Sequence, residues 1–283
     1  MMKDKDKIGK NLMDQHIVGI IPAAGKGVRV APLPGSKELF PVGFGEIEIE
    51  GKQRHYPKVV SNYLIDQMVI AGAEQVYMVV SEGKWDILRY YGGGKRFGVY
   101  LVYLMVDEMI GMPYTINTAF PLVQDATVLF GMPDTIFKPS DALSLLLAQH
   151  NQYKADLTLG LFSTDQSWRF GMVEYDQNNR LIACIDKPNR TQLNFMWGNA
   201  CWGPAFSKLL NDEVTLASSL GEQNEREIVL GDYFSKAVDA GLNVRVFPFN
   251  NGEYMDIGSP KDLARVVKQF AKQELDGNDE IIF

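Results

Sequence analysis

The sequence contains few of the residues that build zinc centres and disulfide frameworks. It has two cysteines, Cys184 and Cys201, and three histidines, His16, His55 and His150, among 283 residues. No C-x-x-C pair occurs, and the histidines are scattered along the chain. Because a zinc centre needs closely spaced ligands and a disulfide framework needs several paired thiols, the sequence predicts neither.

Long apolar runs are also missing. No stretch approaches the ~20 apolar residues that a membrane-spanning helix needs. The first ten residues are basic, but they include Asp4 and Asp6, and the apolar stretch 17–21 is interrupted by Pro22. A signal peptide would have a longer apolar segment free of acidic residues. We therefore expect a flexible tail over residues 1–16, no membrane partner and a cytoplasmic location.

Positive charge is in the minority. The chain carries 28 Lys and Arg against 35 Asp and Glu, which gives a net charge of −7. A surface that attracts nucleic acid or anionic lipid without specificity carries an excess of basic residues. We expect no nucleic-acid partner, and any anionic ligand must be held by a few well-placed cations.

The chain does contain a regular alternation of strand-like and helix-like segments. Runs rich in β-branched and aromatic residues alternate with amphipathic segments, which predicts an α/β fold with a mostly parallel sheet between helices. Shorter strands separated by turn residues follow from about residue 163 and predict a mixed sheet. We expect strands at 17–21, 75–80, 99–106, 126–130, 156–162, 171–175, 181–185, 196–202 and 244–249, and helices at 57–71, 84–91, from 113, 139–153, 204–210, 225–240 and 260–273.

The segment after the first strand has the composition of a phosphate-binding loop. Gly25 and Gly27 let backbone N–H groups approach phosphate oxygens, and Arg29 and Lys37 add positive charge. Val30 stands where a dinucleotide-binding G-x-G-x-x-G would have its third glycine, and no G-x-x-x-x-G-K-[ST] occurs. The two glycines alone are equally compatible with an ordinary turn, and the two cations favour a triphosphate site.

These residues resemble the signature of the sugar nucleotidyltransferase family, which includes glucose-1-phosphate thymidylyltransferases and UDP-glucose pyrophosphorylases. The signature reads roughly G-x-G-[ST]-R followed by P-K-x-L-x-P. Val28 replaces the small hydroxyl residue, the span from the arginine to the lysine is about two residues shorter, and residues 43–56 form an insertion. The matching residues are Gly25, Gly27, Arg29, Lys37, Leu39 and Pro41.

The resemblance implies a Rossmann-like three-layer fold in a single domain, with a nucleotide-binding half over residues 17–162 and a sugar-binding half over 163–283 that includes a C-terminal helix. It assigns Arg29 and Lys37 to the triphosphate. The loop residues expected to bind the nucleotide through their backbone are Ala23, Ala24, Gly25, Lys26 and Gly27, with Gly111 further along the chain.

Two aspartates match the metal ligands of the family. Asp134 follows the strand 126–130, at the end of a sheet strand where α/β proteins bind ligands. Asp256 lies in a Met-Asp-Ile-Gly-Ser-Pro segment that resembles W-x-D-I-G-T-P. The resemblance implies that the pair holds Mg²⁺, which neutralises phosphate oxygens. Taken singly, Asp134 could be a turn residue and Asp256 a helix cap.

Three further segments match those that line the sugar 1-phosphate pocket in the family. By this correspondence Gly171 contacts the sugar through its backbone, Asp186 accepts sugar hydroxyl protons, Lys187 holds the phosphate and Asn199 closes the pocket. Asp186 replaces the customary glutamate and is shorter by one methylene. Lys187 could instead be a solvated surface lysine.

The residue that identifies the base is not recognisable. The glutamine that the family places about five residues before a G-L pair has no counterpart before Gly111-Met112, where Asp107 and Glu108 are the polar residues. The run Gly92 to Gly94 is more typical of a helix exit than of a phosphate site. The sequence therefore leaves the nucleotide open, although the resemblance favours dTTP or UTP.

The resemblance implies that the chain joins a nucleoside triphosphate to a sugar 1-phosphate, with glucose 1-phosphate favoured, and releases pyrophosphate in nucleotide-sugar and polysaccharide synthesis. Family members commonly form homo-oligomers, and no oligomer interface is recognisable here. One alternative is a nucleotide-sugar-binding regulator without turnover, which Val28 and the absent glutamine favour. The other is a metal-dependent glycosyltransferase, but Met132-Pro133-Asp134 lacks the first aspartate of a D-x-D motif.

Overall fold

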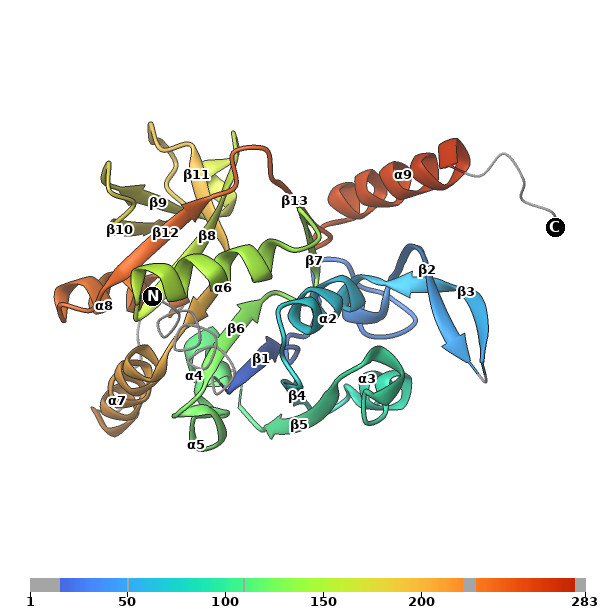
Figure 1. Cartoon of the computed structure of the whole chain (residues 1–283), viewed down its shortest axis with the longest axis horizontal. Helices are drawn as coiled ribbons and strands as arrows, with labels where there is room; N and C mark the ends of the chain where they lie inside the picture. Colours follow the sequence, from blue (N-terminus) through green and yellow to red (C-terminus); the bar gives the residue numbers. More distant parts are fainter. Residues whose placement is uncertain (1–15, 50, 109, 221–227, 278–283) are drawn as a thin grey trace, which may run out of the picture.

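The computed structural model describes residues 16–49, 51–108, 110–220 and 228–277. Within these ranges a nine-stranded mixed sheet lies between two layers of helices (Figure 1). Its strands are β1 (Ile17–Pro22), β4 (Gln75–Ser81), β5 (Tyr100–Val106), β6 (Thr127–Gly131), β8 (Leu157–Ser163), β9 (Gly171–Tyr175), β10 (Leu181–Asp186), β11 (Phe195–Trp202) and β12 (Val244–Pro248).

The first half of the sheet is parallel. Strands β5, β4, β1 and β6 lie side by side in this order, so β1 is flanked by β4 and β6. The carboxyl ends of these strands therefore meet at one edge of the sheet, which is where open α/β sheets bind ligands. The glycine-containing loop follows β1 at this edge.

The second half of the sheet is mixed and continues from β6. Strand β11 runs antiparallel to β6 and also pairs with β8 and β9. Strand β10 forms a hairpin with β9, and β12 runs parallel to β8. The α/β prediction with a mostly parallel sheet that becomes mixed after residue 163 is confirmed.

Each face of the sheet packs its own hydrophobic core against helices, as period-2 alternation in buried strands requires. One core contains side chains from α2 (Val60–Ile70), α3 (Trp85–Tyr91) and α6 (Ala142–Tyr153). The opposite core contains side chains from α4 (Met112–Asn117), α5 (Phe120–Val123), α7 (Pro204–Leu220) and α8 (Leu230–Asp239). Among the described residues, no helix combines the length and apolar character that crossing a bilayer requires.

The insertion 43–56 lies within a β-hairpin. Strands β2 (Pro41–Ile49) and β3 (Lys52–Val59) pair antiparallel and project from the body of the molecule (Figure 1). The predicted helix at 57–71 was wrong at its start, because Pro57 lies in β3 and α2 begins at Val60. The hairpin base packs with α9 (Pro260–Gly277) in a third small core that includes Val42 and Phe270.

Several other predicted bounds change. Helix α7 extends ten residues beyond the predicted end at 210, and α9 also continues past residue 273. The start of the predicted helix at 225–240 and nearly all of the predicted tail over 1–16 lie outside the described residues. Two short strands, β7 (Thr135–Lys138) and β13 (Glu253–Asp256), were not predicted.

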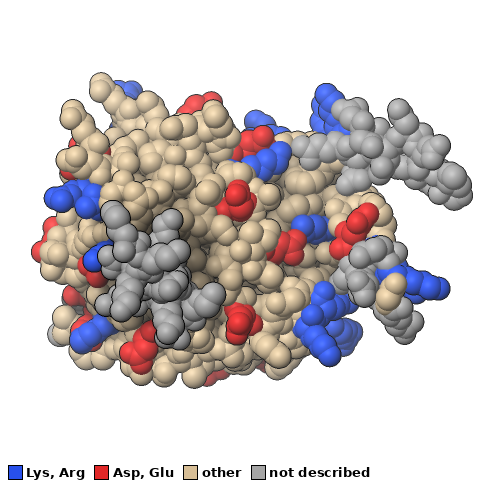
Figure 2. Space-filling view, viewed as in Figure 1, with Lys and Arg blue, Asp and Glu red and all other residues tan. Residues whose placement is uncertain are grey.

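Figure 2 shows basic and acidic side chains interspersed over one face of the molecule.

Candidate functional site

The glycine loop lies at the carboxyl end of β1. Ala23 and Ala24 are buried, and the Ala23 N–H donates a 2.7 Å bond to the Val79 carbonyl of β4, so the loop begins from a fixed point. Gly27 has φ of +64°, a left-handed conformation that favours glycine. A methyl group added at Gly27 would lie 3.5 Å from the Lys37 side chain, so the loop folds back over this lysine.

Two neighbouring cavities open beside this loop. The first, of about 430 Å³, is lined by the loop and by the turn after β4 and is called the loop cavity below. Lys26, Gly27 and Lys37 all line it. Gly25 is exposed at the loop. The loop cavity thus combines glycine backbone with cationic side chains, as an anion site requires.

The second cavity, of about 490 Å³, is lined by residues from both halves of the chain and is called the carboxylate cavity below. It is lined by residues from segments that are far apart in the sequence. The predicted site residues that it brings together are Arg29, Asp134, Gly171, Asp186, Lys187 and Asp256.

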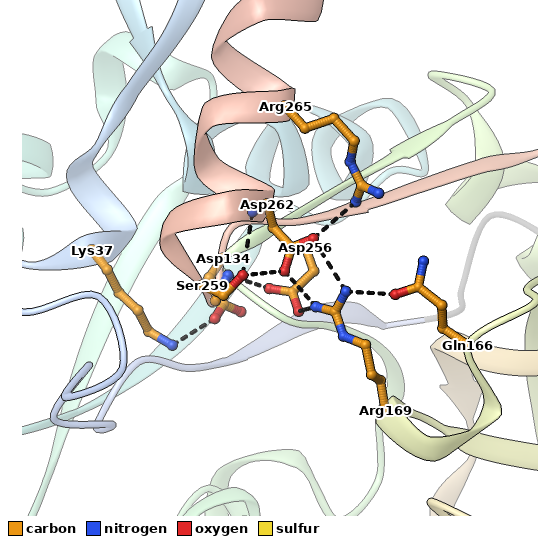
Figure 3. Close-up of polar contacts among 9 residues, drawn as sticks. Lys37, Asp134, Gln166, Arg169, Asp256, Ser259, Asp262 and Arg265 are labelled. Atoms are coloured by element: carbon orange, nitrogen blue, oxygen red, sulfur yellow. Dashed lines mark hydrogen bonds and ion pairs between the residues drawn. The ribbon is translucent and has the colours of Figure 1, made fainter.

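Lys37 and Asp134 connect the two cavities. The Lys37 Nζ lies 2.5 Å from Asp134 Oδ2, and the two side chains are 15% and 7% exposed (Figure 3). Lys37 lines the loop cavity, whereas Asp134 lines the carboxylate cavity. Burial alone would lower the pKa of Lys37, but the charge and hydrogen bond of Asp134, together with the charge of Glu38, raise it overall. Lys37 is therefore held as a cation.

The short strands β7 and β13 bring the two predicted metal ligands to one place. They pair antiparallel with Asp256 opposite Thr135, and the Ile257 N–H donates a 3.1 Å bond to the Asp134 carbonyl. Burial raises the pKa of Asp256, and the neighbouring Asp134 carboxylate raises it further. Two carboxylates that repel each other in a half-buried site form a place where a cation is stabilised.

The donors present fit a magnesium ion. Asp134 and Asp256 offer oxygen ligands only, which hard divalent cations prefer. In the described ranges, no group of three or more His, Cys, Asp or Glu side chains is arranged to hold a metal. Mg²⁺ suits such a site because it keeps several waters and takes phosphate oxygens as ligands.

Arg169 is a residue of this site that the sequence analysis missed. Its guanidinium forms a two-pronged pair with Asp262, through Nη1 to Oδ1 at 3.1 Å and Nη2 to Oδ2 at 2.5 Å (Figure 3). The same Nη2 lies 3.2 Å from Asp256 Oδ2. The positively charged guanidinium of Arg169 therefore lies beside the carboxylate pair and links Asp256 to Asp262 in the first turn of α9. Its position directly before Phe170-Gly171 was the signal available in the sequence.

Lys187 has an unusual backbone conformation at the cavity wall. Its φ is +43°, in the left-handed region that non-glycine residues rarely adopt. The Lys187 N–H donates a 3.0 Å bond to the Phe170 carbonyl, and its Nζ lies 3.8 Å from Asp186 Oδ2. Such strain is found preferentially at functional sites.

Five predicted site residues line neither cavity: Ala23, Ala24 and Gly25 of the glycine loop, and Asn199 and Gly111 further along the chain. Asn199 is fully buried, and a methyl group added at Gly160 would lie 1.9 Å from its Oδ1, so its side chain packs on β8. The register shift between Trp197 and Asn199 explains this, because the extra residue turns the Asn199 side chain away while Trp197 lines the carboxylate cavity. Gly111 instead forms a β-bridge with Ile228.

An α/β sheet with a cationic glycine loop and a carboxylate pair at its ligand-binding edge has the groups from which phosphate and metal-ion sites are built. Residues 18–273 match the family model described as nucleotidyl transferase. The chain belongs to this family.

Several known proteins are similar to this chain. It is 26% identical over 247 residues to the UTP–glucose-1-phosphate uridylyltransferase AglF of Haloferax volcanii, covering 86% of this chain and 92% of AglF. It is 25% identical to a glucose-1-phosphate thymidylyltransferase of Neisseria meningitidis over 87% of this chain and 79% of that protein. The bifunctional protein GlmU of Methanococcus maripaludis is 25% identical over 89% of this chain, but the chain spans only 54% of GlmU.

The fold is also found in a solved structure. A crystal structure from Bacillus anthracis, described as a glucose-1-phosphate thymidylyltransferase in complex with a sucrose, superposes with a TM-score of 0.74. The superposition covers 90% of this chain and 95% of the Bacillus anthracis chain, and the two sequences are 20% identical. The three-layer nucleotidyltransferase fold that the sequence predicted is therefore confirmed.

Proposed function

We propose that this chain transfers a nucleotidyl group from a nucleoside triphosphate to a sugar 1-phosphate, forming a nucleotide sugar and releasing pyrophosphate. The observation that carries the proposal is the Lys37–Asp134 pair, which joins a cationic loop cavity to a cavity that holds the carboxylates and Lys187. A triphosphate beside the loop and a sugar phosphate beside Lys187 would meet at this junction.

The names of the relatives support the substrate class. AglF is named for UTP and glucose 1-phosphate, and the Neisseria protein for thymidylyl transfer to glucose 1-phosphate. We propose dTTP or UTP as the nucleotide and glucose 1-phosphate as the sugar phosphate.

The chain's own residues would act by binding and electrostatics. Arg29 and Lys37 would stabilise the negative charge that accumulates on the triphosphate as the α-phosphorus is attacked, and Lys187 would orient the attacking phosphate oxygen. That oxygen is already ionised at neutral pH, so no side chain has to remove a proton. The bond from the α-phosphorus to the bridging oxygen breaks as the new bond forms, and pyrophosphate leaves with the electron pair.

Asp134 and Asp256 would hold Mg²⁺, which would neutralise phosphate oxygens that otherwise repel the incoming anion. Lys37 contacts Asp134 Oδ2 at 2.5 Å, and Arg169 contacts Asp256 Oδ2 at 3.2 Å. The other oxygen of Asp256, Oδ1, accepts from the Gly258 N–H. Because each carboxylate oxygen has two lone pairs, both aspartates can keep these partners and still bind a cation.

A nucleotide-sugar-binding regulator is the second candidate. Val28 stands where the family has a small hydroxyl residue, and it is 72% exposed at the loop. A regulator would bind a nucleotide sugar in the same cavities and release no pyrophosphate.

We also propose that residues 17–283 act as one domain, in which 17–162 bind the nucleotide and 163–283 the sugar, and that the protein acts in the cytoplasm.

Pyrophosphate release tests the proposal. The assay pairs dTTP, UTP, CTP, GTP and ATP with glucose, galactose, mannose and N-acetylglucosamine 1-phosphates in the presence of Mg²⁺. We expect the wild-type protein to release pyrophosphate with at least one pair of substrates. Asp134→Asn should lose this release, and the surface control Asp212→Asn should keep it. Folded wild-type protein that binds nucleotide sugars and releases no pyrophosphate with any pair would favour the regulator.

A further inference from the structure

We propose that Trp197 contacts a hydroxyl of the sugar, because its side chain lines the carboxylate cavity and its indole N–H has no hydrogen-bond partner among the described residues. This inference rests on the proposed function. It assigns to Trp197 the sugar contact that the sequence pattern had given to Asn199.

The bulge in β11 sets this arrangement. Strand β11 pairs continuously with β8 except for the register shift between Trp197 and Asn199. Asn199 packs beside Gly160 on the face that holds Phe162 and Phe249, whereas Trp197 faces the opposite core and the cavity. Because of this single extra residue, strand β11 presents Trp197 and not Asn199 to the cavity.

The indole is held in one orientation. Its ring meets Phe234 edge to face, with centroids 5.1 Å apart and an interplanar angle of 85°, and Phe130 lies 6.4 Å away. Aromatic pairs in this geometry stabilise each other and restrict rotation of the ring. The N–H direction is therefore fixed before any ligand arrives.

Two glycines fit closely around the nitrogen. A methyl group added at Gly171 would lie 2.4 Å from Nε1, and one added at Gly231 would lie 3.8 Å from it. Both glycines line the same cavity. In the described part of the chain the Trp197 N–H has no hydrogen-bond partner, whereas the Trp202 N–H donates to Ser207 Oγ at 3.1 Å. The Trp197 donor is thus left for a ligand.

The chemistry of this wall suits a sugar hydroxyl. A hydroxyl both accepts and donates, so it can accept from the indole N–H and donate to the Asp186 carboxylate on the same cavity. The neighbouring Cys184 does not compete as an anion, because burial raises the pKa of its thiol to about 12. The apolar C–H groups of a sugar ring can pack against the aromatic wall.

The experiment compares UDP-glucose with UDP by isothermal titration calorimetry, so that the contribution of the sugar is the ratio of the two dissociation constants. Trp197→Phe keeps an aromatic ring and removes the N–H. It should weaken UDP-glucose binding about fivefold, the usual cost of a lost hydrogen bond, while UDP binding stays unchanged. Trp85→Phe, at an exposed tryptophan outside both cavities, is the matched control.

Two further measurements separate this inference from the proposed function. Trp197→His restores a ring N–H and should recover part of the lost affinity, which a packing effect alone would not produce. In the pyrophosphate assay, Trp197→Phe should raise the KM for glucose 1-phosphate and leave the KM for the nucleotide unchanged. Unchanged UDP-glucose affinity in a folded Trp197→Phe overturns the role of Trp197 even if wild-type turnover is confirmed. Wild-type protein without turnover overturns the proposed enzymatic function. The calorimetry then still tests whether Trp197 contacts the sugar.

Discussion

Lys37 Nζ lies 2.5 Å from Asp134 Oδ2, and this pair stands between the loop cavity and the carboxylate cavity. The lysine side chain thus lies beside both proposed substrate sites.

Replacing Lys37 with glutamine should slow turnover strongly. The substitution removes a positioned cation next to the reacting phosphates, and loss of one such electrostatic contact typically lowers kcat by about 10²–10³-fold. Steady-state pyrophosphate release measures the effect. Lys208→Gln, at an exposed lysine on α7 that pairs with Asp212, is the control and should keep wild-type kcat. A Lys37→Gln variant within twofold of wild type would exclude Lys37 from the reaction.

The buried Glu38–Lys84 pair should stabilise the segment that carries Lys37. Glu38 Oε2 lies 2.8 Å from Lys84 Nζ, and the side chains are 2% and 9% exposed. Ser36, two residues before Glu38, donates to Asp86 through its N–H at 2.6 Å and its hydroxyl at 2.7 Å. These contacts fix residues 36–38 to the turn after β4 and to the first turn of α3.

Glu38→Gln should lower the free energy of unfolding by about 3 kcal/mol, because it leaves the Lys84 charge buried without its partner. Urea denaturation measures the change. The exposed pair Lys208–Asp212 supplies the comparison, since Asp212→Asn should cost less than about 1 kcal/mol. Equal small losses in both variants would mean that Lys84 reaches water when Glu38 is neutral.

His150 should make the stability depend on pH. It is 4% exposed, its Nδ1 lies 3.0 Å from Thr158 Oγ1, and burial lowers its pKa from 6.5 to about 4. The unfolded chain therefore binds a proton at a higher pH than the folded chain does, so stability is lost as pH falls from about 6.5 towards 4.

Between pH 7 and pH 5 this residue should account for a loss of about 2 kcal/mol. The difference between wild type and His150→Gln in urea denaturation, measured at both pH values, isolates it from the carboxylates that titrate in both proteins. Parallel pH dependence of the two proteins would show that His150 is protonated as readily in the folded state as in the unfolded state.

Gly171→Ala should damage the proposed sugar side of the site. The new methyl group would lie 2.4 Å from the Trp197 Nε1 and force the indole out of position. Overpacking of this kind typically costs 1–3 kcal/mol, and we expect a raised KM for the sugar 1-phosphate with little change for the nucleotide. Gly93→Ala is the control, because nothing lies within 4 Å of the added group. Identical kinetics in the two variants would contradict a sugar site at Gly171.

The fold was largely predictable because its signals are local. The parallel strands are short apolar runs such as 75–80, and the glycine loop directly follows one of them. The hairpin over Pro41–Val59 was missed because Pro57 can equally start a helix or occupy the edge of a two-stranded sheet.

The site was predictable only in part because its geometry depends on contacts between distant segments. Local patterns do not show that β7 and β13 bring Asp134 beside Asp256, and the order of the family motifs was the only guide. The sequence places Arg169 directly before Phe170-Gly171, but no local pattern pairs it with Asp262. The bulge that presents Trp197 in place of Asn199 shifts the register by one residue, which a period-2 pattern cannot reveal.

The most direct test of the account is the identity of the phosphorus product. Wild-type protein is incubated with Mg²⁺, UTP or dTTP and glucose 1-phosphate, and the reaction is followed by ³¹P NMR. Attack at the α-phosphorus predicts two coupled resonances of a nucleoside diphosphate sugar and an equal amount of pyrophosphate. A nucleoside diphosphate with a doubly phosphorylated sugar, or nucleotides and glucose 1-phosphate left unchanged, would contradict nucleotidyl transfer between these substrates.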